Sequence, residues 1–283
     1  IVLSFLLILV ISQIKAQPLA QRLDSLLSND PMLRTSEVGI TVFDLTTGES
    51  LFQYQDEKLY RPASTEKVVT SVTALATLGL DYTMDTRLQY TGKIENDTLK
   101  GNLYLVGGFD PEFMDEDLDS LVDVIAQSGI RYIADTLAAD VSMMDSVYWG
   151  NGWSWDDVPD SFQPYMSPLM LNRGCVDVTV IPAEKDSLPI IECVPASDYY
   201  QVDNDGVSNN PQAGNLRITR NWLHNGNQIH VTGNVSKKTT RILSIYTSKD
   251  FFFHTFINRL KEKGIEANTT AFADCPQNDS LRV

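Results

Sequence analysis

Histidine and cysteine are scarce in this chain of 283 residues, which contains only three of each. His224, His230 and His254 lack the spacing of metal ligands, and no acidic cluster stands beside them. No Cys-x-x-Cys motif is present either. We therefore expect neither a bound metal nor another cofactor.

The three cysteines are too few for a disulfide framework. If the protein is exported, one disulfide can still form, and the pair expected is Cys175 with Cys193. Cys275 is then left as a free or buried thiol.

Positive charge is also in short supply, with 22 Lys and Arg residues against 37 Asp and Glu residues and a net charge of −15. Such a chain repels phosphate backbones, so nucleic acid is not expected as a partner. Hydrophobic residues make up 43 % of the chain, which is enough for a sizeable core. The length allows one large domain or two ordinary ones.

The first residues are predicted to direct the protein out of the cytoplasm. Residues 1–14 are almost wholly apolar, and Lys15, Ala16 and Gln17 follow them. This pattern is typical of the end of a signal peptide, with cleavage after Ala16, and the run is too short to span a membrane comfortably. The chain begins at Ile1 without a basic segment, so we expect an incomplete N-terminus. A buried N-terminal helix is the alternative.

Hydrophobic periodicity predicts both helices and strands. The helix after Pro62 is expected to bury an apolar face and to end at Gly79. The Asp-, Asn-, Gly- and Pro-rich segment 198–215 is predicted to be a loop. Other expected helices cover 18–27, 118–126 and 251–263, and expected strands cover 38–44, 51–54, 87–90, 99–106, 132–138 and 175–180.

Ser64 and Lys67 form the motif that carries most functional information. Residues three apart on a helix lie on one face, so the Lys67 amine can reach the Ser64 hydroxyl. A serine hydroxyl is a poor nucleophile until a neighbouring base activates it. Ser-x-x-Lys is the nucleophile motif of penicillin-binding proteins and serine β-lactamases, although the pattern alone also occurs by chance.

Four segments together resemble one family. Residues 62–67, 100–111, 152–157 and 172–178 resemble, in the same order, segments of the class C low-molecular-mass penicillin-binding proteins. These proteins are D-alanyl-D-alanine carboxypeptidase/endopeptidases. The resemblance covers most of residues 20–270.

The resemblance implies an α+β, multidomain fold. A serine DD-peptidase domain, similar to a β-lactamase and built on an antiparallel sheet, would be interrupted by a large, mostly-β inserted domain. The expected boundaries are a partial signal peptide at 1–16, the first part of the peptidase domain at 17–86, the insertion at 87–270, and the start of the return to the peptidase domain at 271–283.

The resemblance also implies roles for individual residues. Ser64 would be the nucleophile and Lys67 the general base. Asp157 would meet the amine of a diaminopimelate side chain, with Phe162 as an apolar contact. The expected partners are peptidoglycan peptides and β-lactams, and the expected location is the periplasm. The alternative for Asp157 is a turn cap, with the neighbouring tryptophans packing between domains.

The sequence departs from this family in two motifs. Ser208 and Asn210 form only a formal Ser-x-Asn match within a polar segment, and no Lys-Thr-Gly occurs. We expect truncation of the chain to account for both departures, and the fragment is then expected to be inactive. A degenerate, non-catalytic peptidoglycan-binding relative and a serine β-lactamase are the alternatives. A Ser-His-Asp hydrolase is disfavoured, because no Gly-x-Ser-x-Gly motif is present.

Overall fold

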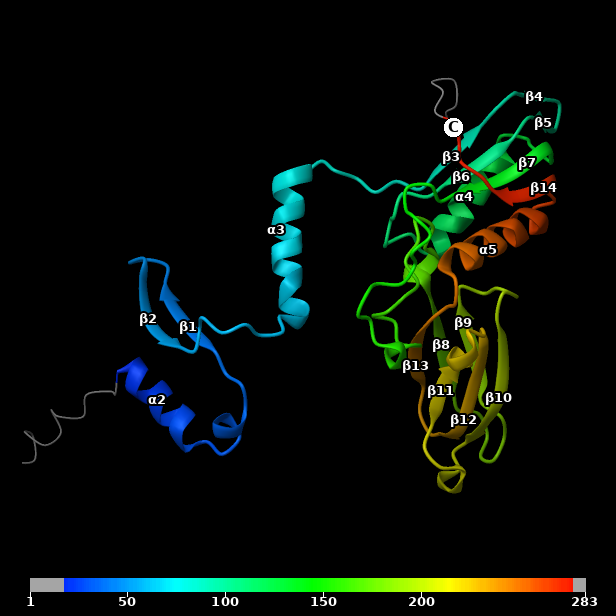
Figure 1. The fold of residues 1–283 in the computed structure, drawn as a ribbon. Coiled ribbons are helices and arrows are strands. Elements are labelled where there is room, and N and C mark those ends of the chain that lie inside the picture. The colour runs from blue at the N-terminus through cyan, green and yellow to red at the C-terminus, as the bar shows by residue number, and fades with distance from the viewer. Residues whose placement is uncertain (1–17, 277–283) are drawn as a thin grey trace, which may run out of the picture. The chain divides into compact units, whose positions relative to one another are not determined.

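The computed structural model describes residues 18–276, so the predicted signal segment 1–16 lies outside the described residues. The chain forms two compact units, which divide between Tyr82 and Thr83. Figure 1 shows unit 1 from blue to cyan and unit 2 from cyan-green to red. The predicted boundaries at 86/87 and 270/271 remain predictions. Between residues 18 and 276, no helix is both long enough and apolar enough to cross a lipid bilayer.

In its described residues, 18–82, unit 1 contains two helices and one hairpin. Strands β1 (Ile40–Asp44) and β2 (Glu49–Tyr54) pair antiparallel. The Asp44 carboxylate accepts a hydrogen bond from the Thr46 backbone N–H at 2.8 Å, which fixes the turn between the strands. The other elements are α2 (Leu19–Asn29), α3 (Glu66–Leu78) and the 3₁₀ turns η1 (Leu33–Thr35) and η2 (Ala63–Thr65).

Helix α3 corrects one prediction. It ends at Gly79 as expected, but none of its residues is buried. Val68 is 65 % exposed and Leu75 is 53 % exposed. The predicted buried face is therefore wrong for this structure, because no other element in the described part of unit 1 covers these side chains. The affected residues are Val68, Val69, Val72, Leu75, Ala76 and Leu78.

The first layer of unit 2 is a six-stranded mixed sheet. The central strand, β7, pairs in parallel with β5 and β6, and also with β14 (Figure 1). Helices α4 (Asp115–Gln127) and α5 (Ser248–Glu262) pack on this sheet. The strands are β3 (Arg87–Tyr90), β4 (Lys93–Glu95), β5 (Thr98–Lys100), β6 (Leu103–Val106), β7 (Tyr132–Asp140) and β14 (Glu266–Phe272).

Residues 99–106 do not form the single strand that was predicted. The strand is interrupted at Gly101, where a Cβ atom would lie 2.0 Å from the Thr91 carbonyl oxygen. Only glycine allows the backbone to come this close. The interruption separates β5 from β6, and both halves then pair with β7.

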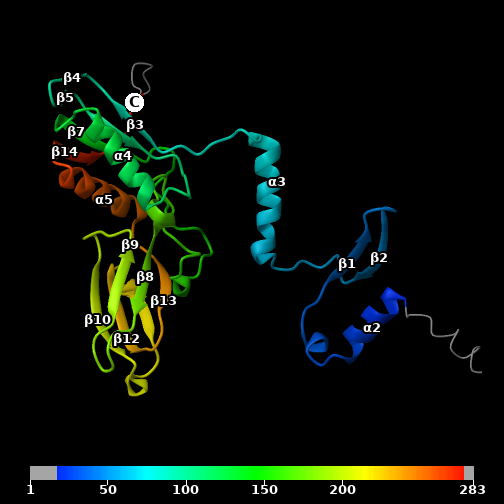
Figure 2. The same ribbon diagram turned by 180° about the vertical axis from the view of Figure 1, so that it is seen from behind.

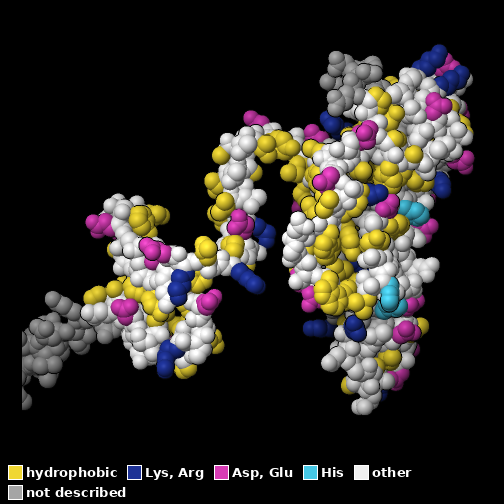
Figure 3. Space-filling model, in the orientation of Figure 1, with side chains coloured by type: hydrophobic (Ala, Val, Ile, Leu, Met, Phe, Trp, Pro, Cys, Tyr) yellow, Lys and Arg dark blue, Asp and Glu magenta, His cyan; other side chains and the backbone are white. Residues whose placement is uncertain are grey.

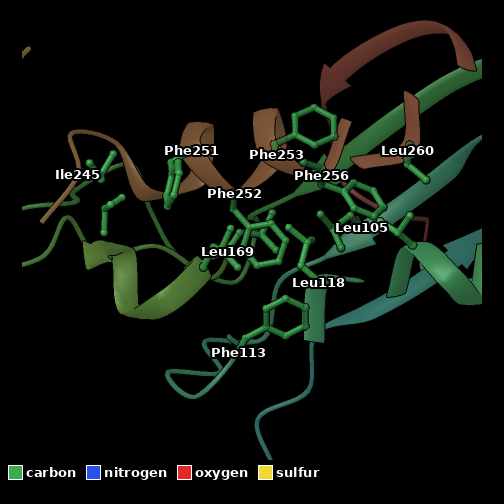
Figure 4. Close-up of a cluster of buried hydrophobic side chains, with 14 of the residues drawn as sticks. Leu105, Phe113, Leu118, Leu169, Ile245, Phe251, Phe252, Phe253, Phe256 and Leu260 are labelled. Atoms are coloured by element: carbon green, nitrogen blue, oxygen red, sulfur yellow. The ribbon is translucent and has the colours of Figure 1, made fainter. Parts of the chain in front are cut away.

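Aromatic side chains from α5 fill the core of this layer (Figure 4). Phe252 is fully buried, and its ring centroid lies 5.0 Å from that of Phe113. Leu105 of β6 and Leu118 of α4 belong to the same cluster. Outside the core, Arg259 of α5 forms ion pairs with two carboxylates of α4. Apolar packing in the core and ion pairs at the surface thus both hold α4 and α5 together.

The second part of unit 2 consists of two three-stranded sheets, seen from behind in Figure 2. One has the order β13-β8-β9 and the other β10-β12-β11. Their strands are β8 (Cys175–Ile181), β9 (Ile190–Val194), β10 (Gln201–Ser208), β11 (Arg217–Arg220), β12 (Gln228–Val235) and β13 (Thr239–Ser244). The 3₁₀ turns of unit 2 are η3 (Trp155–Asp157), η4 (Leu171–Gly174), η5 (Pro211–Ala213) and η6 (Trp222–His224).

Strand β10 overturns the predicted loop at 198–215. It pairs in parallel with β12 over its whole length. Two of its polar side chains bond to neighbours: Asp203 accepts a hydrogen bond from Gln228 at 2.6 Å, and the Asn204 amide donates to the Pro189 carbonyl at 2.8 Å. Composition predicted a loop because these polar side chains are rare in strands, and tertiary pairing overrides that preference.

The predicted disulfide is also wrong, since all three cysteines are free. In the antiparallel β8–β9 pair, Cys193 lies opposite Val178, whereas Cys175 lies opposite Ser244 of β13. Three residues of extended strand therefore separate Cys175 from the position that faces Cys193. That separation is about 10 Å, beyond the roughly 7 Å that a disulfide can bridge.

The buried Cys175 thiol is expected to be unreactive in the folded chain. Burial raises its pKa to about 12, because the thiolate is poorly solvated there. At pH 8 the thiolate fraction is then about 10³-fold below that of an ordinary thiol, and reactivity follows the thiolate. Alkylation followed by peptide mass spectrometry should find Cys175 labelled only in urea, whereas the half-buried Cys275 is labelled earlier. Equal labelling of both in the folded chain would contradict this.

Candidate active site

Ser64 and Lys67 meet at the start of α3. The Lys67 Nζ donates a hydrogen bond to the Ser64 Oγ at 3.0 Å. Ser64 is the middle residue of η2, and Lys67 is the second residue of α3. Both side chains are exposed, so a substrate can approach the hydroxyl. The amine is within reach of the proton that a base must remove.

The backbone before Ser64 holds this geometry. Ala63 has φ of 45°, in the left-handed region that residues with a Cβ atom rarely adopt. Such a conformation costs on the order of 1–3 kcal/mol and is common at active sites. The Thr65 backbone N–H and hydroxyl both donate to the Pro62 carbonyl, which closes the turn. Thr65 therefore has a structural role.

The N-terminus of α3 provides an electrostatic field that stabilises negative charge on the Ser64 hydroxyl oxygen. α3 begins directly after η2, so the partial positive charge of its N-terminus lies beside Ser64. Free N–H groups at such an end stabilise negative charge. The arrangement therefore suits a serine that becomes an alkoxide-like nucleophile during attack.

Asp157 and Phe162 lie in unit 2, on the loop around η3. The Asp157 N–H donates to the Ser154 carbonyl at 3.3 Å, and the Asp157 carbonyl accepts from the Asp160 N–H at 2.9 Å. The Asp157 carboxylate has no hydrogen-bond or ion-pair partner within residues 18–276, and Phe162 is 70 % exposed. Asp157 is half-buried and Phe162 is exposed, and their predicted role in substrate binding stays a prediction.

The Ser208 motif has a structural role. Ser208 is fully buried at the end of β10, where its Oγ accepts a hydrogen bond from the Ala183 N–H at 3.0 Å. Asn209 donates to the Ala183 carbonyl, also at 3.0 Å. These hydrogen bonds hold the loop that contains Ala183 against the end of β10, and they leave the Ser208 hydroxyl inaccessible. In the part of the chain that is described, no cluster of His, Cys, Asp and Glu side chains could hold a metal ion.

Sequence reasoning missed an aromatic contact on the loop that carries Asp157. The rings of Trp155 and Trp222 lie 5.2 Å apart, centroid to centroid. No local pattern could join residues so distant in the sequence. Residue type was the one available signal, since the chain has only four tryptophans.

The comparison with protein families decides where the chain belongs. The model of the D-Ala-D-Ala carboxypeptidase 3 (S13) family matches residues 19–280. The chain belongs to this family. Membership confirms the resemblance predicted from Ser64, Lys67 and the three later segments.

Curated relatives with similar sequences support this family assignment. The D-alanyl-D-alanine carboxypeptidase of Actinomadura sp. (strain R39) is 27 % identical over 256 residues, which cover 87 % of this chain and 47 % of the relative. The D-alanyl-D-alanine carboxypeptidase DacB of Haemophilus influenzae is 28 % identical over 240 residues, or 82 % of this chain and 49 % of the relative. The chain thus spans about half the length of these curated relatives.

A solved structure supports the α+β fold. The crystal structure of penicillin binding protein 4 (dacB) from Haemophilus influenzae matches with a TM-score of 0.68 and 26 % identity, covering 86 % of this chain and 55 % of that one. A second crystal structure of that protein, complexed with a novel β-lactam, matches with a TM-score of 0.63 at 22 % identity and shows the fold alone.

Proposed function

We propose that the chain is part of a penicillin-sensitive, serine-type D-Ala-D-Ala carboxypeptidase/endopeptidase that acts on peptidoglycan stem peptides. The observation that carries the proposal is the 3.0 Å hydrogen bond between Lys67 and Ser64, in a chain that belongs to the S13 family. The acyl-enzyme forms on Ser64.

The chemistry follows from these two side chains. The Lys67 amine, acting as general base, removes the hydroxyl proton while the Ser64 Oγ bonds to the carbonyl carbon between two D-alanines. The C–N bond then breaks, and the terminal D-alanine leaves with a proton on its amine. Water hydrolyses the resulting ester, which releases the shortened peptide and returns a proton to Ser64. Backbone N–H groups beside Ser64 stabilise the oxyanion that precedes each bond cleavage.

The carboxylate of Asp157, which has no protein partner within residues 18–276, supports a role in recognising the substrate. In this proposal it pairs with the ammonium group of a diaminopimelate side chain, because charge-assisted hydrogen bonds to carboxylates are among the strongest. The exposed ring of Phe162 covers the aliphatic part of the same side chain. Both residues belong to an inserted, mostly-β domain that interrupts the peptidase domain.

The complete protein supplies what these residues lack. Because the chain spans about half the length of its relatives, we propose that the Ser-x-Asn and Lys-Thr-Gly motifs belong to the other half and that this chain alone is inactive. Cooperating catalytic groups lose most of their rate when one is removed. Secretion to the periplasm, directed by residues 1–16, places the enzyme beside its substrate.

Labelling of the full-length protein with a fluorescent penicillin tests the proposal. The expected result is one covalent adduct, which peptide mass spectrometry locates on Ser64. The adduct should persist for minutes, because a peptidase hydrolyses it slowly. Fast turnover of nitrocefin would instead indicate a β-lactamase. Absence of any adduct would support the non-catalytic peptidoglycan-binding alternative.

A further inference from the structure

A small aromatic pocket lies in unit 2, beside the loop that carries Asp157. Its volume is ≈ 240 Å³. Three of the four tryptophans of the chain line it. Figure 3 shows hydrophobic side chains gathered on the visible face of unit 2. The lining residues are Trp149, Trp155, Val158, Tyr165, Trp222, Leu223 and Asn225.

The size of this aromatic pocket limits what it can hold. Pockets for drug-sized molecules have volumes of about 300–1,000 Å³. The aromatic pocket is therefore suited to one ring-sized unit of a longer ligand.

Two segments distant in the sequence build its walls. Trp149 packs against Tyr165 with ring centroids 5.2 Å apart, and both belong to the loop around η3. Trp222 comes from η6 and faces Trp155 at 5.2 Å, with 33° between the ring planes. Trp155 is 66 % exposed, so its indole presents a broad apolar face to solvent. Large exposed aromatic faces in one place are typical of binding sites.

The charges around the pocket argue for a neutral ligand. None of the seven described residues that line it is charged. The buried guanidinium of Arg220 lies 6.0 Å from the centroid of the Tyr165 ring. This positive charge already interacts with the aromatic cluster and disfavours a cationic ligand, which such a cluster could otherwise bind.

The pocket also offers hydrogen-bond donors. Within residues 18–276, the indole N–H groups of Trp149, Trp155 and Trp222 have no protein acceptor. Asn225 accepts a long hydrogen bond of 3.4 Å from the Tyr165 hydroxyl, which leaves its amide N–H groups available. A matching ligand has an apolar face for the rings and acceptors around its edge. An aliphatic side chain has the first property but lacks the second.

We propose that this pocket binds one pyranose unit of a neutral, N-acetylated polysaccharide strand. A pyranose ring presents axial C–H groups to an aromatic face, and hydroxyl and acetamido groups at its edge. The inference rests on the proposed function, since peptidoglycan joins its stem peptides to such a strand. The site is formed by residues other than Asp157 and Phe162, so the enzyme holds the glycan and the peptide separately.

Calorimetric titration of the full-length protein with chitohexaose, a soluble chain of N-acetylated pyranoses, tests the site. Saturable binding is expected, and Trp155→Ala and Trp222→Ala should each weaken it by about ten-fold or more. Trp155→Phe should retain part of the affinity. Tyr132→Ala is the control, because this exposed ring lies on β7, outside the pocket, and it should leave binding unchanged.

Two results would overturn the inference: no heat of binding with millimolar chitohexaose, or equal binding by the Trp155→Ala variant. Binding of tetramethylammonium in place of chitohexaose would also overturn it, in favour of a cation site. Penicillin labelling of Ser64 separates the two proposals. Labelling without chitohexaose binding overturns the glycan site alone, whereas binding without labelling overturns the peptidase proposal and supports the pocket.

Discussion

Replacing Lys67 with alanine is expected to slow the acylation of Ser64 by penicillin about 10²–10⁴-fold, the range that one positioned acid or base contributes. The variant removes the amine that lies 3.0 Å from the nucleophile. Ser64 then has no base within hydrogen-bond reach among the described residues of unit 1. The rate is measured with the full-length protein by stopping the labelling reaction at successive times.

Two further variants make the Lys67 result specific. Lys67→Arg should be nearly as slow, because a guanidinium keeps the charge but cannot accept a proton at neutral pH. Lys58→Ala is the matched control, since Lys58 is an exposed lysine of unit 1 that hydrogen-bonds to Gln55. Its labelling rate should be unchanged. Normal labelling of Lys67→Ala would show that another group activates Ser64.

Phe252→Ala is expected to lower the free energy of unfolding of unit 2 by about 3–5 kcal/mol, as for other large aromatic truncations in a core. Phe252 is fully buried and packs against Phe113 between α5 and the sheet. Truncation leaves a cavity that the close-packed neighbours cannot fill completely. Urea denaturation measures the change, and tryptophan fluorescence reports on unit 2 alone, because all four tryptophans lie within it.

The control for this prediction is Phe162→Ala, the same substitution at a ring that is 70 % exposed. Its effect should stay within about 0.5 kcal/mol, as for other surface substitutions. If both variants unfolded at the same urea concentration, Phe252 would not belong to the cooperative core of unit 2.

The sequence predicted best what depends on neighbours in the chain. Ser64 and Lys67 could be paired because helical geometry alone brings residues three apart together. Gly79 could be recognised as the end of α3 for an equally local reason. Family membership followed from several such local segments taken in order, which is why it was confirmed.

Features that depend on distant pairing could not be predicted. The composition of β10 predicts a loop, because the parallel pairing with β12 that supplies its backbone hydrogen bonds is not evident from the sequence. The register of β8 and β9 separates Cys175 from Cys193, and the number and spacing of the cysteines in the sequence do not predict this register. The contact between Trp155 and Trp222 likewise depends on how η6 approaches the loop around η3.

The central position of β7 affects how unit 2 folds while the chain is being synthesised. Tyr132 at the start of β7 pairs with Glu266 at the start of β14, so the sheet is complete only after nearly all of the unit has left the ribosome. Contacts between such distant residues slow folding, because a long loop must close before they form. During synthesis, the backbone groups on the edge of β7 that faces β14 therefore remain unpaired until β14 has been made. Chaperone dependence should consequently be greatest for nascent chains that end before β14.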